Sequence, residues 1–265
     1  MQTVSQTLFP ETAARLEAWR ASDDVVGVLL VGSKCRGYGD ALSDDDLEVL
    51  LTDEAHARLS PEATSEVVFS GEGASRKLVY DAYYTAISDL EGKVASPRDL
   101  DHWPYEQAQV LFDRDGRVEA AVRAAGRMDL AFRRLRLLHA GIDAYNAVYR
   151  AQKCKRRDFE AAVATNVARG AKALSRLLFA LEGRWVPMDH WLEPELASLS
   201  DSEACVPLLL QALKTHDPDP LLQALTRLQS ALEAEGFPAP SERAALFLTL
   251  IHPSRADERL IHGLP

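Results

Sequence analysis

The feature of the sequence that most constrains its fold is one stretch, VVGVLLVGSKCRGYGDALSDDDLEVLL, at residues 25–51. It begins with an apolar, β-branched run at residues 25–31 and ends with a second apolar run at residues 47–51. Short apolar runs bounded by turn residues are typical of buried strands. Between the two runs lie a Gly32-Ser33 turn, a polar loop and consecutive aspartates. The stretch therefore predicts two strands whose connection places a glycine–serine turn beside a group of carboxylates.

The rest of the chain divides by its periodicity into a strand-rich half and a helical half. Pro10 predicts the start of a short helix, and further strand-like segments occur at residues 65–69, 76–85 and 109–112. Later the apolar period becomes helical, which predicts helices at residues 117–126, 129–152, 158–182, 202–215, 220–235 and 241–251. We predict an α+β fold, with a mixed β-sheet flanked by helices in residues 1–115 and an all-α helical bundle in residues 116–265.

Composition and charge exclude several classes of protein. The formal net charge of −10 disfavours a nucleic-acid surface, because such surfaces need clustered lysine and arginine. No apolar stretch is long enough to span a membrane, and the first residues lack the pattern of a signal peptide. The three cysteines, Cys35, Cys154 and Cys205, match no zinc or disulfide pattern. We expect a cytoplasmic protein that binds neither nucleic acid nor membrane and has a small or cationic partner.

The aspartates before the second strand have the pattern of a metal site. Alternate residues of a strand share a face, so Asp44 and Asp46 point one way and Asp45 points the other, where we expect it to face solvent. Two carboxylates so close together repel each other, and a bound cation relieves that repulsion. Magnesium prefers oxygen ligands and is usually held by one or two carboxylates plus substrate phosphates. Glu48 lies farther along the same face and is an auxiliary or structural acid.

The turn before the aspartates supplies groups that bind phosphate. Gly32 permits a tight backbone path, and the Ser33 hydroxyl and nearby amides can donate to a phosphate oxygen. Lys34 and Arg36 add positive charge, and the arginine fork matches phosphate geometry. The spacing is not that of the P-loop, which disfavours a Walker-type nucleotide hydrolase.

A third acid is expected on a later strand. In the run RKLVYDAYYT, Asp81 interrupts an otherwise apolar strand in its middle. A carboxylate in a sheet interior is costly unless it has a partner, and the predicted metal is a suitable one. The alternative is an ion pair with Arg76 or Lys77 at a sheet edge.

Together these residues resemble a known superfamily. A Gly32-Ser33 turn, a loop, two aspartates in the arrangement DxD, an apolar strand and an acid on a later strand resemble the polymerase-β-like nucleotidyltransferases. The string GSKCRGYGDALSDDDLEVLL is similar to the bacterial branch that includes aminoglycoside and lincosamide nucleotidyltransferases. The motif-bearing part covers roughly residues 25–90, and GAKALSRLLFALEGRWVPMDHWL in the helical half is a looser match.

The resemblance implies a reaction. ATP or another nucleoside triphosphate binds with Mg²⁺, as two ions, on Asp44 and Asp46; a hydroxyl of a small-molecule acceptor attacks the α-phosphorus and pyrophosphate leaves. Asp81 either completes the metal site or takes the hydroxyl proton. Some antibiotic-modifying relatives have a glutamate near this place, so the role of base stays open. The acceptor that the resemblance implies is an aminoglycoside-like antibiotic, and the expected assembly is a monomer or a homodimer.

The helical half departs from the family pattern. Relatives often carry a lysine that reaches the nucleotide phosphates where this chain has Met188-Asp189-His190. His190 is a candidate to contact the substrate in its place. Lys153 is a candidate to bind the nucleotide from the basic run at residues 153–157, where Lys155 and Arg157 are the alternatives. Trp103 is a candidate to stack on a substrate ring, with core packing as the alternative. Two other functions stay open: a nucleotide-binding regulatory module without catalysis, and nucleotidylation of a protein or RNA.

Overall fold

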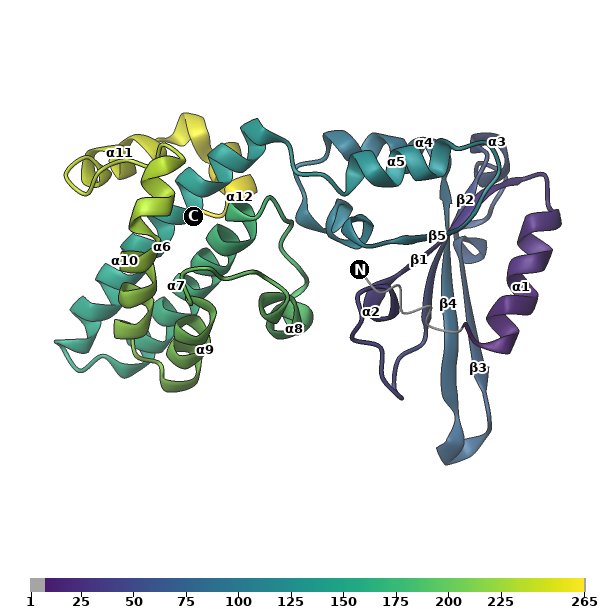
Figure 1. Ribbon diagram of the computed structural model, residues 1–265, viewed down its shortest axis with the longest axis horizontal. Helices are drawn as coiled ribbons and strands as arrows, with labels where there is room; N and C mark the ends of the chain where they lie inside the picture. Colours follow the sequence, from purple (N-terminus) through teal and green to yellow (C-terminus); the bar gives the residue numbers. More distant parts are fainter. Residues whose placement is uncertain (1–7, 265) are drawn as a thin grey trace. The chain divides into compact units, whose positions relative to one another are not determined.

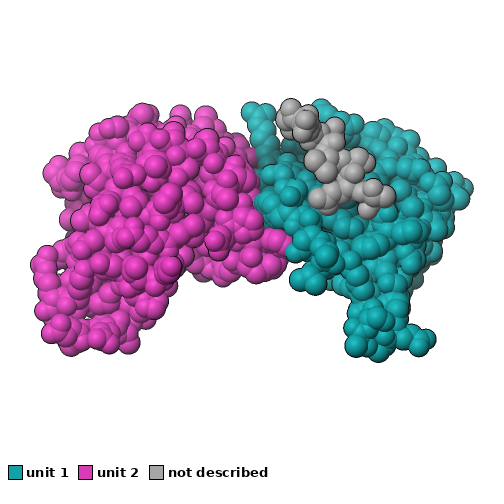
Figure 2. Space-filling model, turned by 60° about the horizontal axis from the view of Figure 1, so that its bottom comes forward, with its two compact units in different colours: residues 1–127 teal, residues 128–265 magenta. Residues whose placement is uncertain are grey.

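The computed structural model describes residues 8–264. The chain forms two compact units, residues 1–127 (unit 1) and residues 128–265 (unit 2), which Figure 2 colours separately. The division falls later than the boundary at residues 115/116 that the sequence suggests. The reason is that helix α5 (Arg117–Ala125) packs against the strands of unit 1 through Val118 and Val122. The first helix after the sheet therefore belongs to unit 1.

Unit 1 contains a five-stranded mixed sheet in the order β3-β4-β2-β1-β5 (Figure 1). The strands are β1 (Val25–Val31), β2 (Asp45–Leu51), β3 (Ser65–Ser70), β4 (Lys77–Ala86) and β5 (Gln109–Asp113). The pair β2–β4 is parallel and the other three pairs are antiparallel. A mixed sheet followed by a helical region confirms the predicted fold class.

Helices cover both faces of the sheet, which explains why its central strands read as unbroken apolar runs. Helix α1 (Pro10–Ala21) packs one face, called here the α1 face, through Leu16 and Trp19. Helices α4 (Ile87–Gly92) and α5 pack the other, called here the α5 face, against Leu29 and Leu50. Figure 1 shows α1 and α5 on different sides of the strands.

Short helical segments connect these elements. They are α2 (Gly32–Cys35), α3 (Asp53–His56), η1 (Pro61–Thr64), η2 (Gly73–Ser75), η3 (Lys93–Ala95), η4 (Asp99–Asp101) and η5 (Trp103–Glu106). The segment α2 begins immediately after β1, so the glycine–serine turn of the sequence is a single helical turn at the end of a buried strand.

Unit 2 is helical. Its elements are α6 (Leu130–Lys155), α7 (Glu160–Leu181), η6 (Asp189–Trp191), α8 (Leu192–Ala197), α9 (Val206–Thr215), α10 (Asp219–Ala234), α11 (Arg243–Leu250), η7 (Pro253–Arg255) and α12 (Ala256–His262). The Asp129 carboxylate caps α6 by accepting hydrogen bonds from the amides of Ala131 and Phe132. No helix in residues 8–264 has the length and apolarity needed to cross a membrane.

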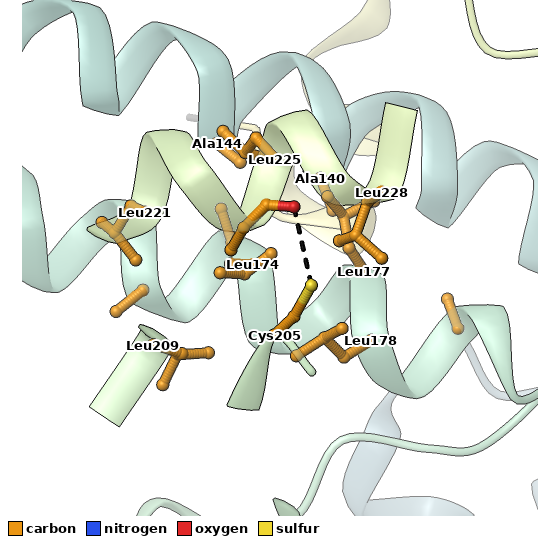
Figure 3. Packing of buried hydrophobic residues seen from close by; sticks show 14 of the residues in the cluster. Ala140, Ala144, Leu174, Leu177, Leu178, Cys205, Leu209, Leu221, Leu225 and Leu228 are labelled. Carbon is orange, nitrogen blue, oxygen red and sulfur yellow. Dashed lines mark hydrogen bonds between the residues drawn. The ribbon is translucent and has the colours of Figure 1, made fainter. Parts of the chain in front are cut away.

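The core of unit 2 is built from leucines and alanines of α6, α7, α9 and α10 (Figure 3). Cys205 lies among them, and its Sγ is 3.5 Å from the Ala224 carbonyl oxygen. Burial raises the pKa of the Cys205 thiol to about 11, so it is protonated at neutral pH. None of the three cysteines, which all lie within residues 8–264, forms a disulfide. Cys205 is therefore a packing residue.

Candidate active site

Three aspartates of unit 1 converge at one end of the sheet. Asp46 is near the start of β2, Asp44 precedes that strand, and the parallel pairing sets Asp46 opposite Asp81 of β4. Each of the three half-buried carboxylates offers an oxygen atom within 4.8 Å of the others. The structure thus brings together the three acids that the sequence analysis selected. Their roles as metal ligands and catalytic groups stay predictions.

Gly32 sits directly against this cluster. Its φ is +74°, and a Cβ atom built on it would lie only 1.9 Å from Asp46 Oδ2. A side chain at this position would therefore collide with the carboxylate. The Ser33 amide is close enough to Asp46 to lower the pKa of its carboxyl, while the buried Ser33 hydroxyl lies 3.2 Å from Ser43 Oγ. The turn thus contacts the acids through its backbone.

The cluster is electrostatically strained without a cation. Burial, followed by the charges of Asp44, Asp81 and Asp45, raises the pKa of Asp46 from 3.8 to about 7, and the Ser33 amide offsets only part of this. Burial and the Asp44 charge also raise the pKa of Asp81. Among residues 8–264, no cation forms an ion pair with any of these three acids. An all-oxygen donor set of this kind fits Mg²⁺.

Asp45 is buried, and the expectation that it faces solvent is wrong. Its side chain is fully buried, and the Lys34 ammonium lies 2.5 Å from Oδ1. The Phe9 amide donates to Oδ2 at 3.0 Å. A buried carboxylate needs such partners, because a lone charge in the interior is costly. Lys34 is therefore an ion-pair partner of Asp45 rather than a free cation beside the turn.

Arg36 and Trp103, expected to contact nucleotide and substrate, are both buried in unit 1. The Arg36 side chain has no exposed surface; it donates to the Trp103 carbonyl oxygen and lies 3.8 Å from Glu106. Its guanidinium carbon is 4.0 Å from the centroid of the Trp103 ring, which is 2% exposed. The structure therefore places these side chains in the core, where Arg36 connects the loop after α2 to η5. Their predicted roles in nucleotide and substrate binding stay predictions.

Glu48 is a structural acid on the α5 face. The Tyr105 hydroxyl donates to Oε2 at 2.6 Å, while Thr85 Oγ1 and Lys93 Nζ each lie 3.1 Å from Oε1. Burial and the Glu48 charge raise the pKa of Tyr105, which keeps its hydroxyl protonated. Glu48 and Asp46 are neighbours on one strand face, but within the described part of the chain only Glu48 is paired with a cation, Lys93.

This network gives a testable prediction. Tyr105→Phe removes a hydrogen bond to a buried carboxylate, so we expect the free energy of unfolding to fall by about 1–3 kcal/mol. Urea denaturation measures the change, and Tyr149→Phe, whose ring is 61% exposed, is the matched control with a change near zero. ATP affinity should be the same in both variants. A large loss of ATP affinity in Tyr105→Phe would contradict a structural role.

The other two residues predicted to bind nucleotide or substrate, Lys153 and His190, lie on the surface of unit 2. Lys153 is exposed near the end of α6, with its ammonium 5.6 Å from the centroid of the Tyr149 ring. His190 is exposed in η6, and its ring centroid is 5.3 Å from that of Trp191. Their predicted roles in nucleotide and substrate binding stay predictions.

Unit 2 also contains a cationic cavity that the sequence analysis missed. Arg169, Lys172 and Arg176 line a cavity of about 300 Å³ together with Asp143 and Gly263. Arg169 Nε donates to the Asp143 carboxylate at 2.9 Å. The signal in the sequence is the spacing of three and four residues, which puts all three cations on one helix face. The basic run at residues 153–157 is the more obvious cluster of cations in the sequence.

Comparison with known proteins returns little. No family model matches the sequence, and no curated protein matches it. Among solved structures, the chain is similar to a nucleotidyltransferase-like protein from Exiguobacterium sibiricum. The two share 16% sequence identity at a TM-score of 0.46, over 95% of this chain and 86% of that chain. At this identity and TM-score the match carries no functional argument, so function rests on the geometry of the site.

Proposed function

We propose that the chain is a Mg²⁺-dependent nucleotidyltransferase that moves AMP from ATP to a hydroxyl of a small molecule. The observation that supports it is the cluster of three aspartates, whose carboxylates each offer an oxygen within 4.8 Å of the others and which form no ion pair with a cation of residues 8–264. The glycine–serine turn against Asp46 adds backbone groups beside the cluster. Sites that bind metal-bound triphosphates combine acids with close backbone in this way.

Each group has a role in this proposal. Asp44 and Asp46 would hold Mg²⁺, as two ions when the nucleotide is bound, and the bound ions would supply positive charge to the triphosphate and the pyrophosphate leaving group. The acceptor oxygen forms a bond to the α-phosphorus, and the bond from that phosphorus to pyrophosphate breaks. Asp81 takes the proton of the hydroxyl, a role that suits a carboxyl whose pKa is raised by burial.

The acceptor that the family resemblance implies is an aminoglycoside-like polycation, and the net charge of −10 is compatible with it. The chain acts as a monomer or a homodimer in this proposal, with no nucleic acid or membrane as partner. Nothing in the three-aspartate cluster itself selects an acceptor.

Calorimetry of ATP binding tests the proposal. We expect wild-type protein to bind ATP at least about tenfold more tightly with Mg²⁺ than without it, and Asp44→Ala to lose that difference. Asp23→Ala, which removes an exposed acid elsewhere in unit 1, should behave as wild type. ATP binding that is indifferent to both Mg²⁺ and Asp44 would refute the proposal. Metal-dependent binding without pyrophosphate release on any acceptor would favour a non-catalytic nucleotide-binding module.

A further inference from the structure

Unit 1 has a cavity of about 560 Å³ on the α1 face of its sheet, called here the back cavity. Helix α1 supplies one part of its lining, the segment from α3 to η1 supplies another, and the strands contribute Val25, Leu51 and Tyr84. Sites for small molecules usually have volumes of about 300–1,000 Å³. The back cavity therefore has the size of a small-molecule site.

The back cavity is separate from the three aspartates. Successive residues of a strand point to opposite faces of the sheet. Tyr84 lies three positions after Asp81 on β4, and Leu51 lies five positions after Asp46 on β2, so each tyrosine or leucine faces away from its aspartate. A ligand in the back cavity would therefore contact the sheet from the side opposite the candidate active site.

The interior of the back cavity is largely apolar. Trp19, Val25, Leu51 and Ala55 belong to the buried cluster on the α1 face, and Leu59 packs against that cluster. Apolar surface of this kind stabilises a ligand by removing apolar area from water. The lining therefore suits the apolar or aromatic body of a small compound.

One end of the cavity is polar, and its carboxylate is already saturated. Glu66 Oε1 accepts a hydrogen bond from the Tyr80 hydroxyl at 2.5 Å. Its Oε2 accepts from the Tyr84 hydroxyl at 2.7 Å and from Arg15 Nε and Nη2 at 3.2 and 2.6 Å. A carboxylate offers about four acceptor positions, so these four bonds leave Glu66 little capacity to bind a cationic or hydroxyl group of a ligand.

Arg15, in contrast, has donors to spare. Its Nη2 also lies 3.2 Å from the Tyr84 hydroxyl oxygen, but within residues 8–264 its Nη1 makes no hydrogen bond. The ion pair with Glu66 and the Trp19 ring, whose centroid is 5.2 Å from the guanidinium carbon, hold the side chain in place, and it is 39% exposed. A guanidinium held in this way is suited to bind an oxyanion through its remaining N–H groups.

The other charged pair of the lining does not change this preference. Arg58 and Asp24 form an ion pair at 2.9 Å, and their side chains are 62% and 58% exposed. Charges this exposed are hydrated and have little influence on a ligand. The unused donors of Arg15 therefore determine which ligand charge the back cavity favours.

We propose that the back cavity binds a small amphipathic anion, with its carboxylate on Arg15 Nη1 and its aromatic or apolar body against Trp19 and Leu51. This site goes beyond the proposed nucleotidyl transfer, because it includes none of the three aspartates. Binding here requires neither Mg²⁺ nor ATP.

Three probes that share one ring test the charge preference. We expect wild-type protein to bind indole-3-acetate about tenfold more tightly than its neutral counterpart indole-3-acetamide, and to bind the cation tryptamine more weakly than both, as measured by calorimetry. Arg15→Gln should reduce the preference for the acetate at least about fivefold. Arg20→Gln, which removes an exposed cation of the same helix outside the cavity, should leave the preference unchanged.

A second pair of variants tests the place of binding without disturbing the Glu66 network. Ala18 is an exposed residue of the lining, so Ala18→Trp should fill part of the cavity and weaken indole-3-acetate binding at least about tenfold. Ala14→Trp is the matched control, because Ala14 is exposed on the same helix and does not line the cavity. Its affinity for indole-3-acetate should equal that of the wild type.

Four results would overturn the inference. They are equal affinity for the acetate and the acetamide, no binding of indole-3-acetate at millimolar concentration, a preference that survives Arg15→Gln, and equal affinity in the two tryptophan variants. Displacement of indole-3-acetate by ATP with Mg²⁺ would also overturn it, because the probe would then occupy the candidate active site.

Discussion

Asp46→Asn is expected to stabilise the metal-free protein at pH 8 and to abolish its activity. The carboxyl of Asp46 has a pKa of about 7 in the folded protein against an ordinary value of 3.8. Between these values the folded state binds more protons than the unfolded state, so stability falls as pH rises. The difference amounts to about 4 kcal/mol once pH exceeds 7, as an upper estimate. Asparagine does not ionise, so the variant does not lose stability in this way as pH rises.

Urea denaturation in EDTA at pH 5, 6, 7 and 8 measures the effect. The gain of the asparagine variant over the wild type should be largest at pH 8 and should shrink steadily toward pH 5. Mg²⁺ should raise the stability of the wild type at pH 8 and leave the variant nearly unchanged. Asp23→Asn controls for the loss of one negative charge. A gain that is the same at every pH would show that repulsion at Asp46 is not its cause.

The same substitution tests catalysis. In the proposed mechanism, Asp46→Asn removes a carboxylate that would hold the Mg²⁺ needed to neutralise the triphosphate, so we expect pyrophosphate release to fall by about a thousandfold or more. Replacing a structural acid lowers both the free energy of unfolding and the activity. A variant that is more stable but inactive therefore shows that Asp46 is a functional acid.

Gly32→Ala is expected to destroy the site although it adds one carbon atom. The new Cβ would lie 1.9 Å from Asp46 Oδ2, so the carboxylate or the turn must move. The positive φ adds about 1–2 kcal/mol of backbone strain. We expect Mg²⁺-dependent ATP binding to disappear and the free energy of unfolding to fall by more than the strain alone.

Gly37 offers the matched control for this experiment. Its φ is +82°, but no atom lies within 4 Å of a Cβ built on it. Gly37→Ala therefore shares the backbone strain and lacks the collision with Asp46. Calorimetry should find normal Mg²⁺-dependent ATP binding in this variant. If both alanine variants lose Mg²⁺-dependent ATP binding equally, the close approach of Gly32 to Asp46 is not the reason that position 32 requires glycine.

The sequence was sufficient to predict what depends on local periodicity. The alternation of a strand places Asp44 and Asp46 on one face, and an acid within an apolar strand selects Asp81. The long helices α6 and α7 follow from their apolar stripes, and the strand at Val25–Val31 has its predicted bounds. The short helices α8 and α12 escaped prediction because six or seven residues show too little of a 3.6-residue period.

What the sequence could not show are contacts between distant segments. Alternation gives the face on which Asp45 lies, but only the structure shows that Lys34 and the Phe9 amide meet it there. In the sequence Arg36 looks like an exposed loop cation, but its guanidinium donates a hydrogen bond to the carbonyl oxygen of Trp103, which is far along the chain. The hydrogen bond from Tyr105 to Glu48 also joins distant segments. Tertiary contacts of this kind leave no periodic signal.

The contrast between Glu48 and Asp46 has a consequence for how the site responds to its surroundings. Glu48 is neutralised by Lys93, a cation that the protein always carries. Asp46, on the same strand face, is neutralised near neutral pH by a proton, because its pKa is about 7. In the proposed function, a metal ion that binds here must displace that proton. Hydrogen ions would then compete with the metal, and a fall in pH would inhibit the proposed activity.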